Sequence, residues 1–441
     1  MFSIVYLPIE IKHRELPSRL LMAHYLLHAG YAVVIGNQWS LSANHENLAE
    51  GLFLFKSMNA VQARSMATAR KAGHVIVASD EGALGAVDEE GFLREVTNLA
   101  AENCDLFLSQ SPTHADIVER KFPGLRGRVH VVGNPRLELF LPELRHVLSD
   151  PRTQALRPYL LFVTNYGTIN SLWAGERDPM EIAQLSGAFD GPERESKMRN
   201  FSAALAWERT NYQALLDVAK WTARHVKGLN IIVLPDPGER PYHWEHAMAG
   251  LPNVTVVSRS DPHPWIANAA LVVHTGSAAV VEAVLLDTPV LNLLPQDHPC
   301  RGLLVTHLNP TVRTAPDAIA AIYAFFTSRS GPIPEFRGKA ESALHKYMPA
   351  TRDKTAAAFA NIMIKELSAR GAVPAPAGGH PIPPRGSYKR CHRSDADTDN
   401  FTTDKSEITA WLGLIAGISG AAPGFTVSEL DESVYLIAPT P

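Results

Sequence analysis

The sequence predicts an α/β protein built from two doubly wound, parallel-sheet domains in tandem. Short, continuously apolar runs alternate with segments of helical periodicity along most of the chain. Apolar runs of this kind are typical of parallel strands that are covered on both faces. The alternation breaks off in a polar stretch around Pro151 and Pro158 and then starts again. A chain of 441 residues is long enough for two such domains.

The first predicted domain covers residues 1–145. Its strands are expected at residues 2–7, 31–35, 51–55, 74–78, 106–109 and 129–132, with Pro8 ending the first of them. Helices are expected at residues 16–29, 60–71, 93–102 and 113–121. Because parallel strands need crossover connections, this order predicts right-handed βαβ units.

The second predicted domain covers residues 146–350. Its strands are expected at 159–163, 231–234, 254–257, 271–274 and 290–293, and its helices at 202–225, 244–249, 278–286 and 317–326. The connection 164–198 is too long for a plain linker and is typical of a binding loop.

Three further segments follow the second domain. An amphipathic closing helix is expected in residues 351–370. Residues 371–405 are rich in Pro, Gly and charge, which predicts a flexible linker. The tail, 406–441, is expected to hold a short helix at 411–418 and a strand at 434–437. Docking on another protein and packing on its own chain are both compatible with this tail.

Composition excludes several classes of protein. The net charge of −4, from 41 basic and 45 acidic side chains, provides no general basic field for nucleic acid. Three cysteines without a CxxC pair indicate a reducing, cytoplasmic compartment and argue against disulfides and zinc. The apolar start, MFSIVYLP, is interpreted as a strand and not as a signal peptide. No run reaches the ~20 apolar residues that span a bilayer, which leaves only peripheral membrane association open.

Cofactor motifs are not found either. The first strand is followed by Pro8 and Ile9 instead of a GxGxxG turn, and no P-loop occurs. A nicotinamide-dependent dehydrogenase and a P-loop ATPase are therefore not expected. We expect no cofactor and assign no metal ligand.

The turn Thr275-Gly276-Ser277 lies between an apolar strand that ends at His274 and a helix that contains Glu282. Free amides and the positive end of the helix dipole at such a turn attract an anion. Gly276 would allow a ligand to approach the backbone closely. The turn is therefore a candidate phosphate site. An ordinary α/β turn with Ser277 as the helix cap is the alternative.

Polar clusters follow other predicted strands, at the edge where ligands of parallel sheets bind. They are Glu10, Lys12 and Arg14; Asp80 and Glu81, before Gly82; and Asp236 and Glu239, in the loop 234–240. A carboxylate at position 80 or 81 could take a proton from a sugar hydroxyl. Solvated loops or simple turns are the alternatives at each cluster. The expected ligand site is the cleft between the two domains.

Several strings taken together resemble one family. They are PIEIKHREL, DEG, VVGNPRLELFLPE, LPDPGERPYHW, LPNVTVV and HPWIANAALVVHTGSAAVVEAVLLDTPVL. In order and spacing they resemble the bacterial surface-carbohydrate biosynthesis protein family. That family is similar to the GT-B-fold β-Kdo glycosyltransferases and, more distantly, to bacterial sialyltransferases. The resemblance spans roughly residues 1–367 and excludes the tail.

The resemblance implies two Rossmann-like domains, the second holding most of the donor, a CMP-Kdo-like nucleotide sugar. It implies a glycan acceptor of surface polysaccharide, capsule or lipopolysaccharide. Glu81 would be the base, with Asp80 as its rival, and Thr275, Gly276 and Ser277 would hold the phosphate. Glu282 would contact the ribose. The remaining expected nucleotide contacts are Asp236, Glu239 and His274, and the expected substrate contacts are Glu10, Lys12, Arg14, Asn134, Arg136 and Asn165.

Asp236 departs from the family pattern, which has a histidine that contacts the donor phosphate. A like-charge pair at about 4 Å costs on the order of 4 kcal/mol at an effective dielectric constant of roughly 20. Asp236 would have to be turned away, protonated or bridged by a metal, or the donor would have to differ, or transfer would be lost. A glycosyltransferase is the leading hypothesis. The alternatives are a UDP-sugar 2-epimerase and a non-catalytic sugar-nucleotide-binding protein.

Overall fold

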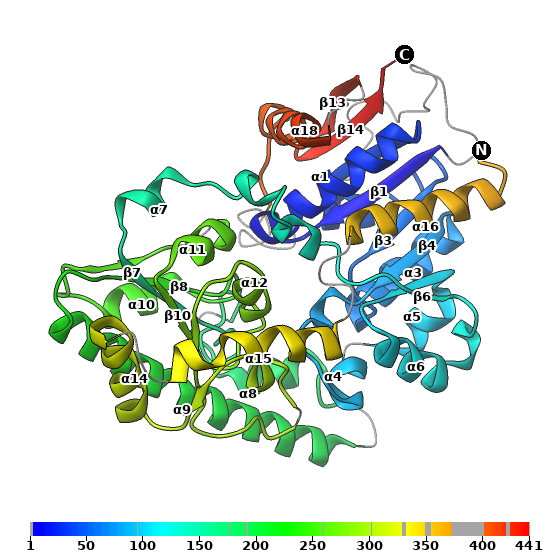
Figure 1. Ribbon diagram of the computed structural model, residues 1–441. Coiled ribbons are helices and arrows are strands. Elements are labelled where there is room, and N and C mark those ends of the chain that lie inside the picture. Colours follow the sequence, from blue (N-terminus) through cyan, green and yellow to red (C-terminus); the bar gives the residue numbers. More distant parts are fainter. Residues whose placement is uncertain are drawn as a thin grey trace. The chain divides into compact units, whose positions relative to one another are not determined.

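The computed structural model describes residues 3–94, 96–174, 176–190, 193–258, 260–300, 302–328, 332–348, 354–372, 401–419 and 424–440. The chain divides into two compact units (Figure 1). Unit 1 comprises residues 1–84, 92–147 and 348–441, and unit 2 comprises residues 85–91 and 148–347. Each unit is built on its own sheet, so the predicted α/β class with two parallel-sheet domains is confirmed.

Unit 1 contains a sheet with the strand order β13-β14-β2-β1-β3-β4-β5-β6. Its parallel strands are β1 (Ile4–Ile9), β2 (Ala32–Asn37), β3 (Leu52–Phe55), β4 (Val75–Ser79), β5 (Leu106–Ser109) and β6 (Val129–Val131). Its helices are α1 (Lys12–His28), α2 (Gln38–Ser42), α3 (Ala60–Lys71), α5 (Asn98–Asn103), α6 (Pro112–Lys121), α16 (Thr355–Ala369) and α18 (Lys405–Ser419). Short 3₁₀ turns are η1 (Glu81–Ala83), η2 (Pro123–Leu125), η3 (Leu137–Phe140) and η4 (Arg145–Val147), and α4 (Glu89–Leu93) spans the boundary between the units.

The expectation that Pro8 ends the first strand is wrong, because β1 continues to Ile9. The carbonyl of Ser3 accepts a hydrogen bond from Ala32 at the start of β2. Since successive residues of a strand face opposite neighbours, the nitrogen of Pro8 faces β3. The register between β1 and β3 ends at Tyr6 and Phe53, so no ladder bond is lost at Pro8.

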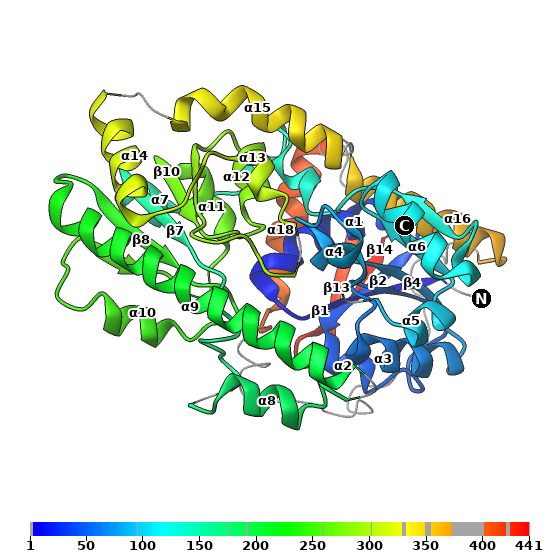
Figure 2. The ribbon, with the colours of Figure 1, turned by 90° about the horizontal axis from the view of Figure 1, so that it is seen from below.

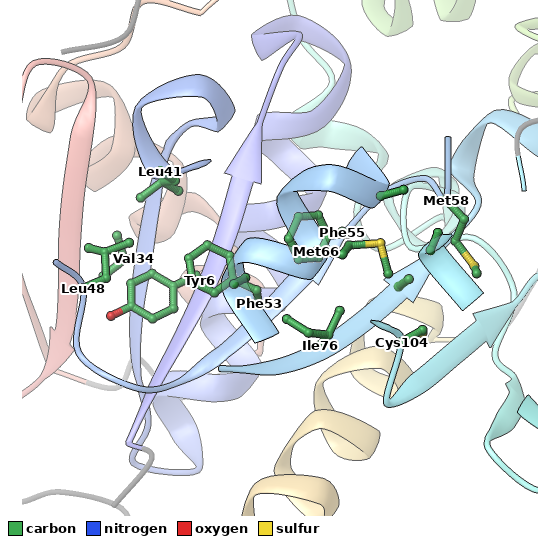
Figure 3. Close-up of a cluster of buried hydrophobic side chains, with 14 of the residues drawn as sticks. Tyr6, Val34, Leu41, Leu48, Phe53, Phe55, Met58, Met66, Ile76 and Cys104 are labelled. Atoms are coloured by element: carbon green, nitrogen blue, oxygen red, sulfur yellow. The ribbon is translucent and has the colours of Figure 1, made fainter. Parts of the chain in front are cut away.

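An aromatic core fills one face of this sheet (Figure 3). Tyr6 and Phe53 stack on neighbouring strands with ring centroids 4.3 Å apart. Met58 and Met66 lie in the same cluster, and every one of these side chains is at most 1% exposed. The core follows from alternate residues of each strand pointing to one face, as the apolar runs predicted.

The C-terminal residues complete the sheet of unit 1. β14 (Val434–Pro439) pairs antiparallel with β2, and β13 (Phe425–Asp431) pairs antiparallel with β14. The helix expected at 411–418 is α18, which packs on α1 and begins earlier, at Lys405. The predicted tail therefore packs on its own chain and makes the sheet mixed. Most of the predicted linker, 371–405, lies outside the described residues.

Unit 2 contains a fully parallel sheet with the strand order β12-β11-β10-β7-β8-β9. Its strands are β7 (Tyr159–Val163), β8 (Asn230–Leu234), β9 (Val254–Val256), β10 (Leu271–His274), β11 (Val290–Leu293) and β12 (Thr311–Val312). Its helices are α7 (Pro151–Ala155), α8 (Pro179–Leu185), α9 (Arg194–His225), α10 (Pro241–Ala247), α11 (Pro262–Asn268), α12 (Val280–Leu285), α13 (Val305–Leu308), α14 (Ala315–Ser328) and α15 (Pro332–Tyr347).

The long helix α9 begins at Arg194 and not at the predicted Ser202 (Figure 2). Residues 193–197, 199 and 200 are all polar and exposed. This first part of the helix therefore lacks the spacing of apolar residues from which a helix is recognised in a sequence. The connection expected at 164–198 also contains α8. Among the helices that the structure describes, none is both long and apolar enough to cross a bilayer.

Candidate functional site

The two sheets each have a point where the winding direction reverses. In unit 1 the chain runs outward from β1 to β2 on one side and to β3 on the other. In unit 2 it runs outward from β7 to β8 on one side and to β10 on the other. Crevices at the carboxyl ends of the strands at such reversals are the usual ligand sites of open α/β sheets. Most of the residues singled out from the sequence follow these strands.

Lys56 gathers two carboxylates at the reversal in unit 1. It follows β3, and its Nζ lies 2.7 Å from Oε2 of Glu10, which follows β1. Nζ also pairs with Glu15, whose Oε2 accepts a hydrogen bond of 2.9 Å from the amide of Glu10. Burial pushes the pKa of Glu15 upward, but the charges of Lys56 and Arg19 outweigh it and lower the pKa. Burial likewise disfavours the charged Lys56, but Glu15 and Glu10 raise its pKa.

Glu81 lies immediately after β4 and is held by a buried arginine. Oε1 of Glu81 accepts a 2.6 Å bond from Nη2 of Arg19, with side-chain exposures of 5% and 0%. Oε2 of Glu81 has no hydrogen-bond partner among the residues that the structure describes. The amide of Glu81 donates to the carbonyl of Lys56 at 2.9 Å. This bond links the Arg19–Glu81 ion pair to the group formed by Lys56, Glu10 and Glu15. Neighbouring Asp80 is 2% exposed, and its carbonyl accepts a bond from Gln110.

Sequence reasoning found Glu10, Asp80 and Glu81, left Glu15 out of the expected contacts although it ends the same polar cluster, and missed Arg19 and Lys56. A signal was present: Glu15 and Arg19 are charged residues four apart on the otherwise apolar face of α1. Lys56 directly follows an apolar strand, as the other candidates do.

Of the remaining candidate residues of unit 1, some lie near Lys56 and others lie elsewhere in the unit. Lys12 pairs with Oε2 of Glu407 at 2.7 Å and donates to the carbonyl of Thr402, so it contacts the C-terminal segment. Arg14 is partly buried and lies close enough to Lys56 to oppose its charge. Asn134 and Arg136 follow β6, three strands from β3 in the sheet. Both are buried, and Oδ1 of Asn134 accepts the amide of Arg136 at 3.1 Å.

Asn165 and Thr275 meet at the reversal in unit 2, after β7 and β10. Nδ2 of Asn165 donates to the carbonyl of Thr275 at 3.2 Å. Oγ1 of Thr275 donates back to Oδ1 of Asn165 at 3.1 Å, and it also bonds the hydroxyl of Tyr166 at 2.6 Å. Burial raises the pKa of Tyr166 well above its usual range. Hydrogen bonds from Asn165 and Tyr166 therefore connect the loop after β7 to the turn at residues 275–277.

The amides of Gly276 and Ser277 are not free, contrary to the expectation from the sequence. The amide of Gly276 donates to Oδ1 of Asn292 at 3.1 Å, and that of Ser277 donates to Nδ1 of His274 at 3.1 Å. Both residues precede α12, which begins at Val280. A strand-end asparagine and histidine thus use the donors that were assigned to a phosphate.

Packing also explains the glycine at position 276. Its φ of +81° lies in the left-handed region that other residues rarely adopt. A Cβ at this position would lie 2.9 Å from Cδ1 of Leu303 and 3.5 Å from the ring of Trp207. The groups that approach the backbone of Gly276 closely are therefore the side chains of Leu303 and Trp207, and not the ligand expected from the sequence.

His274 keeps one unused donor at the turn. Because Nδ1 accepts a bond from Ser277, the hydrogen of the neutral ring is assigned to Nε2. Burial lowers the pKa of His274 to about 3, so the ring is neutral at physiological pH. Nε2 is buried and has no hydrogen-bond partner among the described residues. The Nε2–H group is therefore a buried donor whose hydrogen-bonding capacity is unused among the described residues.

Asp236 is turned into its own loop. Oδ1 accepts the amide of Gly238 at 2.9 Å, and the amide of Asp236 contacts Oγ1 of Thr164 at 3.2 Å. Glu239, at 2% exposure, accepts bonds from Tyr166, Trp244 and Asn170. Burial raises the pKa of Glu239 in spite of these donors. The Glu239 carboxylate ties the loop after β8 to the loop after β7, whereas the Asp236 carboxylate bonds within its own loop.

Glu282 faces a buried histidine. Its Oε2 lies 3.3 Å from Nε2 of His263, whose Nδ1 lies 2.7 Å from Oδ1 of Asp261. Burial disfavours the charged His263, but Asp261 and Glu282 outweigh it and raise the pKa to about 10. Glu282 is 2% exposed, so this ion pair joins α12 to α11 inside unit 2.

Comparison with known proteins supports the fold. No protein-family model matches the chain, and no curated protein matches it in sequence. A solved structure described as a UDP-N-acetylglucosamine 2-epimerase from Listeria monocytogenes has a TM-score of 0.52 at 12% identity, covering 85% of this chain and 99% of that chain.

Two further solved structures are similar. MnaA of S. aureus, in a co-structure with UDP, has a TM-score of 0.51 at 10% identity, covering 85% of this chain and 98% of that chain. The wall teichoic acid polymerase TagF, in a variant with CDPG, has a TM-score of 0.51 at 9% identity, covering 84% and 90%. At such identities the similarity is one of fold, and the fold is GT-B-like.

Proposed function

We propose that this protein is a cytoplasmic glycosyltransferase of bacterial surface-polysaccharide synthesis that transfers a sugar from a nucleotide sugar to a glycan acceptor. One observation carries the proposal: Glu81 is anchored through Oε1 by Arg19 and keeps Oε2 without a partner among the described residues. This arrangement suits a base, because one oxygen fixes the orientation of the carboxylate while the other receives a proton. The motif resemblance and the GT-B-like fold support the same class.

The reaction would proceed as follows. Oε2 of Glu81 takes the proton of an acceptor hydroxyl while the hydroxyl oxygen bonds the anomeric carbon of the donor sugar. The bond from that carbon to the nucleotide phosphate breaks, and the phosphate leaves with the electron pair. Asp80, the preceding residue, is the rival base. Groups that stabilise the departing phosphate lower the barrier further.

The nucleotide is assigned to the reversal in unit 2. Nε2 of His274 and the hydroxyl of Ser277 are the donors we assign to its phosphate, beside Thr275 and Gly276. Asp236, Glu239 and Glu282 would act mainly by holding the surrounding loops, in view of their internal bonds. A CMP-Kdo-like donor rests on the motif resemblance. The acceptor is assigned to Glu10, Arg14, Asn134, Arg136 and Asn165, with Lys12 at the periphery.

The test compares Glu81→Gln and Asp80→Asn with Glu102→Gln, an exposed carboxylate of unit 1. Release of CMP from CMP-Kdo is measured with a glycan acceptor. We expect E81Q to lose about 10²- to 10⁴-fold in rate, the usual contribution of a general base. Nucleotide binding, measured by calorimetry, should be unchanged in all three variants. If both E81Q and D80N kept the full rate, the assignment of the catalytic base to Glu81 or Asp80 would be wrong.

A UDP-sugar 2-epimerase is the second candidate. One structure of similar fold is described as a UDP-N-acetylglucosamine 2-epimerase, and MnaA, another, is in a co-structure with UDP. This reaction needs no acceptor. Incubation with UDP-N-acetylglucosamine alone, followed by NMR of the product, separates the two: a C2 epimer favours the epimerase. Binding of CMP or UDP without turnover of any donor would favour a non-catalytic nucleotide-binding protein.

A further inference from the structure

A pocket of about 290 Å³ lies between α2 and α3 of unit 1. Figure 2 shows these two helices side by side, and side-chain hydrogen bonds join them. The lining of the pocket includes Gln38, Trp39 and Ser42 of α2 and Gln62, Arg64 and Ser65 of α3. None of them belongs to the proposed transfer site, although Lys56 reaches the pocket edge.

Gln62 presents an unsatisfied acceptor in this pocket. Its side chain is 8% exposed, and its Nε2 donates to Oε1 of Gln38 at 3.3 Å. Its Oε1 is buried without a hydrogen-bond partner among the described residues. An unsatisfied buried acceptor destabilises the folded protein, and a hydroxyl of a bound molecule would offset this cost. The free acceptor therefore favours a ligand that donates a hydrogen bond to Oε1 of Gln62.

The other walls supply hydroxyl groups and an aromatic surface. Oγ of Ser65 donates to Oγ of Ser42 at 2.8 Å, which leaves the hydroxyl hydrogen of Ser42 for another acceptor. Trp39 is partly exposed and lines the same pocket. An aromatic face beside amide and hydroxyl groups suits a sugar ring, whose C–H faces are apolar and whose edge carries hydroxyls.

Arg64 adds a positive charge at the rim. It is exposed, and no ion pair joins its guanidinium to any described residue. Guanidinium groups bind carboxylates and phosphates in a bidentate manner. The rim thus selects an anionic substituent, in contrast to Lys56, whose charge is already paired with Glu10 and Glu15.

We propose that this pocket binds a single sugar ring that carries a carboxylate or phosphate group. The ring stacks on Trp39, one hydroxyl donates to Oε1 of Gln62, and the anion contacts Arg64. The volume is at the lower end of the roughly 300–1,000 Å³ of ligand pockets, which suits one ring and not a whole nucleotide sugar. This binding does not depend on the transfer reaction.

Titration of the full chain tests the proposal, with saturation-transfer NMR and calorimetry as readouts. The probes are glucuronate, glucose 6-phosphate, glucose and inorganic phosphate, so that the two sources of the anion are compared directly. We expect both acidic sugars to bind. Glucose should bind about tenfold more weakly, because it lacks one charge-assisted contact. Inorganic phosphate alone should show no saturable binding. Preference for one acidic sugar over the other identifies the anion.

Variants assign the binding to this pocket. Arg64→Ala should remove the preference for acidic sugars, whereas Arg126→Ala, an exposed arginine of the same unit, should not. Gln62→Leu should weaken every sugar, and CMP or UDP titrations on the same samples report separately on unit 2. Absence of saturable sugar binding would overturn the proposal. So would equal binding of phosphate and glucose 6-phosphate, or an equal response of R64A and R126A.

Discussion

The guanidinium of Arg19, in α1, lies 2.6 Å from the carboxylate of Glu81, which follows β4, and both side chains are buried. The two residues are 62 positions apart in the sequence. Their ion pair ties the first helix to the carboxyl edge of the sheet, at the point where the proposed base acts. It is therefore both a structural contact and a means of orienting Glu81.

Removing the arginine should destabilise the fold strongly. Arg19→Met leaves Glu81 buried without its partner, which costs about 3–5 kcal/mol in the free energy of unfolding, measured by urea titration. Arg120→Met, whose partner Asp116 is exposed, should cost at most about 1 kcal/mol. In the double variant R19M/E81Q much of the loss should be recovered. Equal effects of R19M and R120M would show that the buried pair has no special weight.

The start of α16 should depend on Glu138. Oε2 of this carboxylate accepts the amides of Ala356 at 2.8 Å and Ala357 at 3.2 Å, and its Oε1 accepts a bond from Tyr25. Glu138→Ala leaves these donors without a partner, so we expect a loss of about 2–3 kcal/mol, measured by thermal unfolding. Glu102→Ala, on an exposed residue, is the control and should change little.

Crowding at Gly276 can be separated from its backbone conformation. Gly276 and Gly250 share a φ of +81°, but a Cβ at Gly250 would meet nothing within 4 Å. Gly250→Ala should cost about 1–2 kcal/mol for the left-handed conformation alone. Gly276→Ala should cost about 1–3 kcal/mol more, because the new methyl group overlaps Leu303. Comparable unfolding free energies in the two variants would exclude the crowding.

Stability should fall at alkaline pH through His263. Its pKa is raised from 6.5 to about 10 in the folded state, so its contribution is complete below pH 6.5 and is lost as pH rises through about 10. In His263→Gln this part of the decline should be missing, a difference of at most about 1.4 kcal/mol per pH unit. Urea unfolding at several pH values measures it. His225→Gln, at an exposed position, should retain the wild-type slope.

The C-terminal hairpin should be part of the folding unit. Ile437, which pairs with Val33 of β2, is 0% exposed, whereas Thr426 of β13 is exposed. Ile437→Ala should cost about 2–5 kcal/mol by leaving a cavity, while Thr426→Ala should change little. Hydrogen exchange of the β2 amides would follow the same order. Unchanged stability of I437A would mean that the hairpin only rests on the sheet.

Much of the candidate site followed from the sequence because strand ends are recognisable locally. An apolar run followed by a polar cluster located Glu10, Asp80, Glu81, Asn165 and the turn at 275–277. What each side chain contacts was not recognisable in this way. Whether Asp236 faced a ligand or its own loop depended on the amide of Gly238, and the apolar pattern carries no information on such bonds.

By itself the sequence determined two parallel-sheet units and the edge at which polar residues gather, because burial on both sheet faces imposes continuous apolar runs. Only the tertiary structure decided that Asn292 and His274 occupy the amides of the turn, that Arg19 holds Glu81, and that β14 extends the first sheet. The physical reason is range: apolar periodicity is a local property, whereas the contacts of Asn292, Arg19 and β14 join groups that lie far apart in the sequence. The bond from Ser277 to His274 is local, but it depends on the orientation of a side chain, which the apolar pattern does not encode.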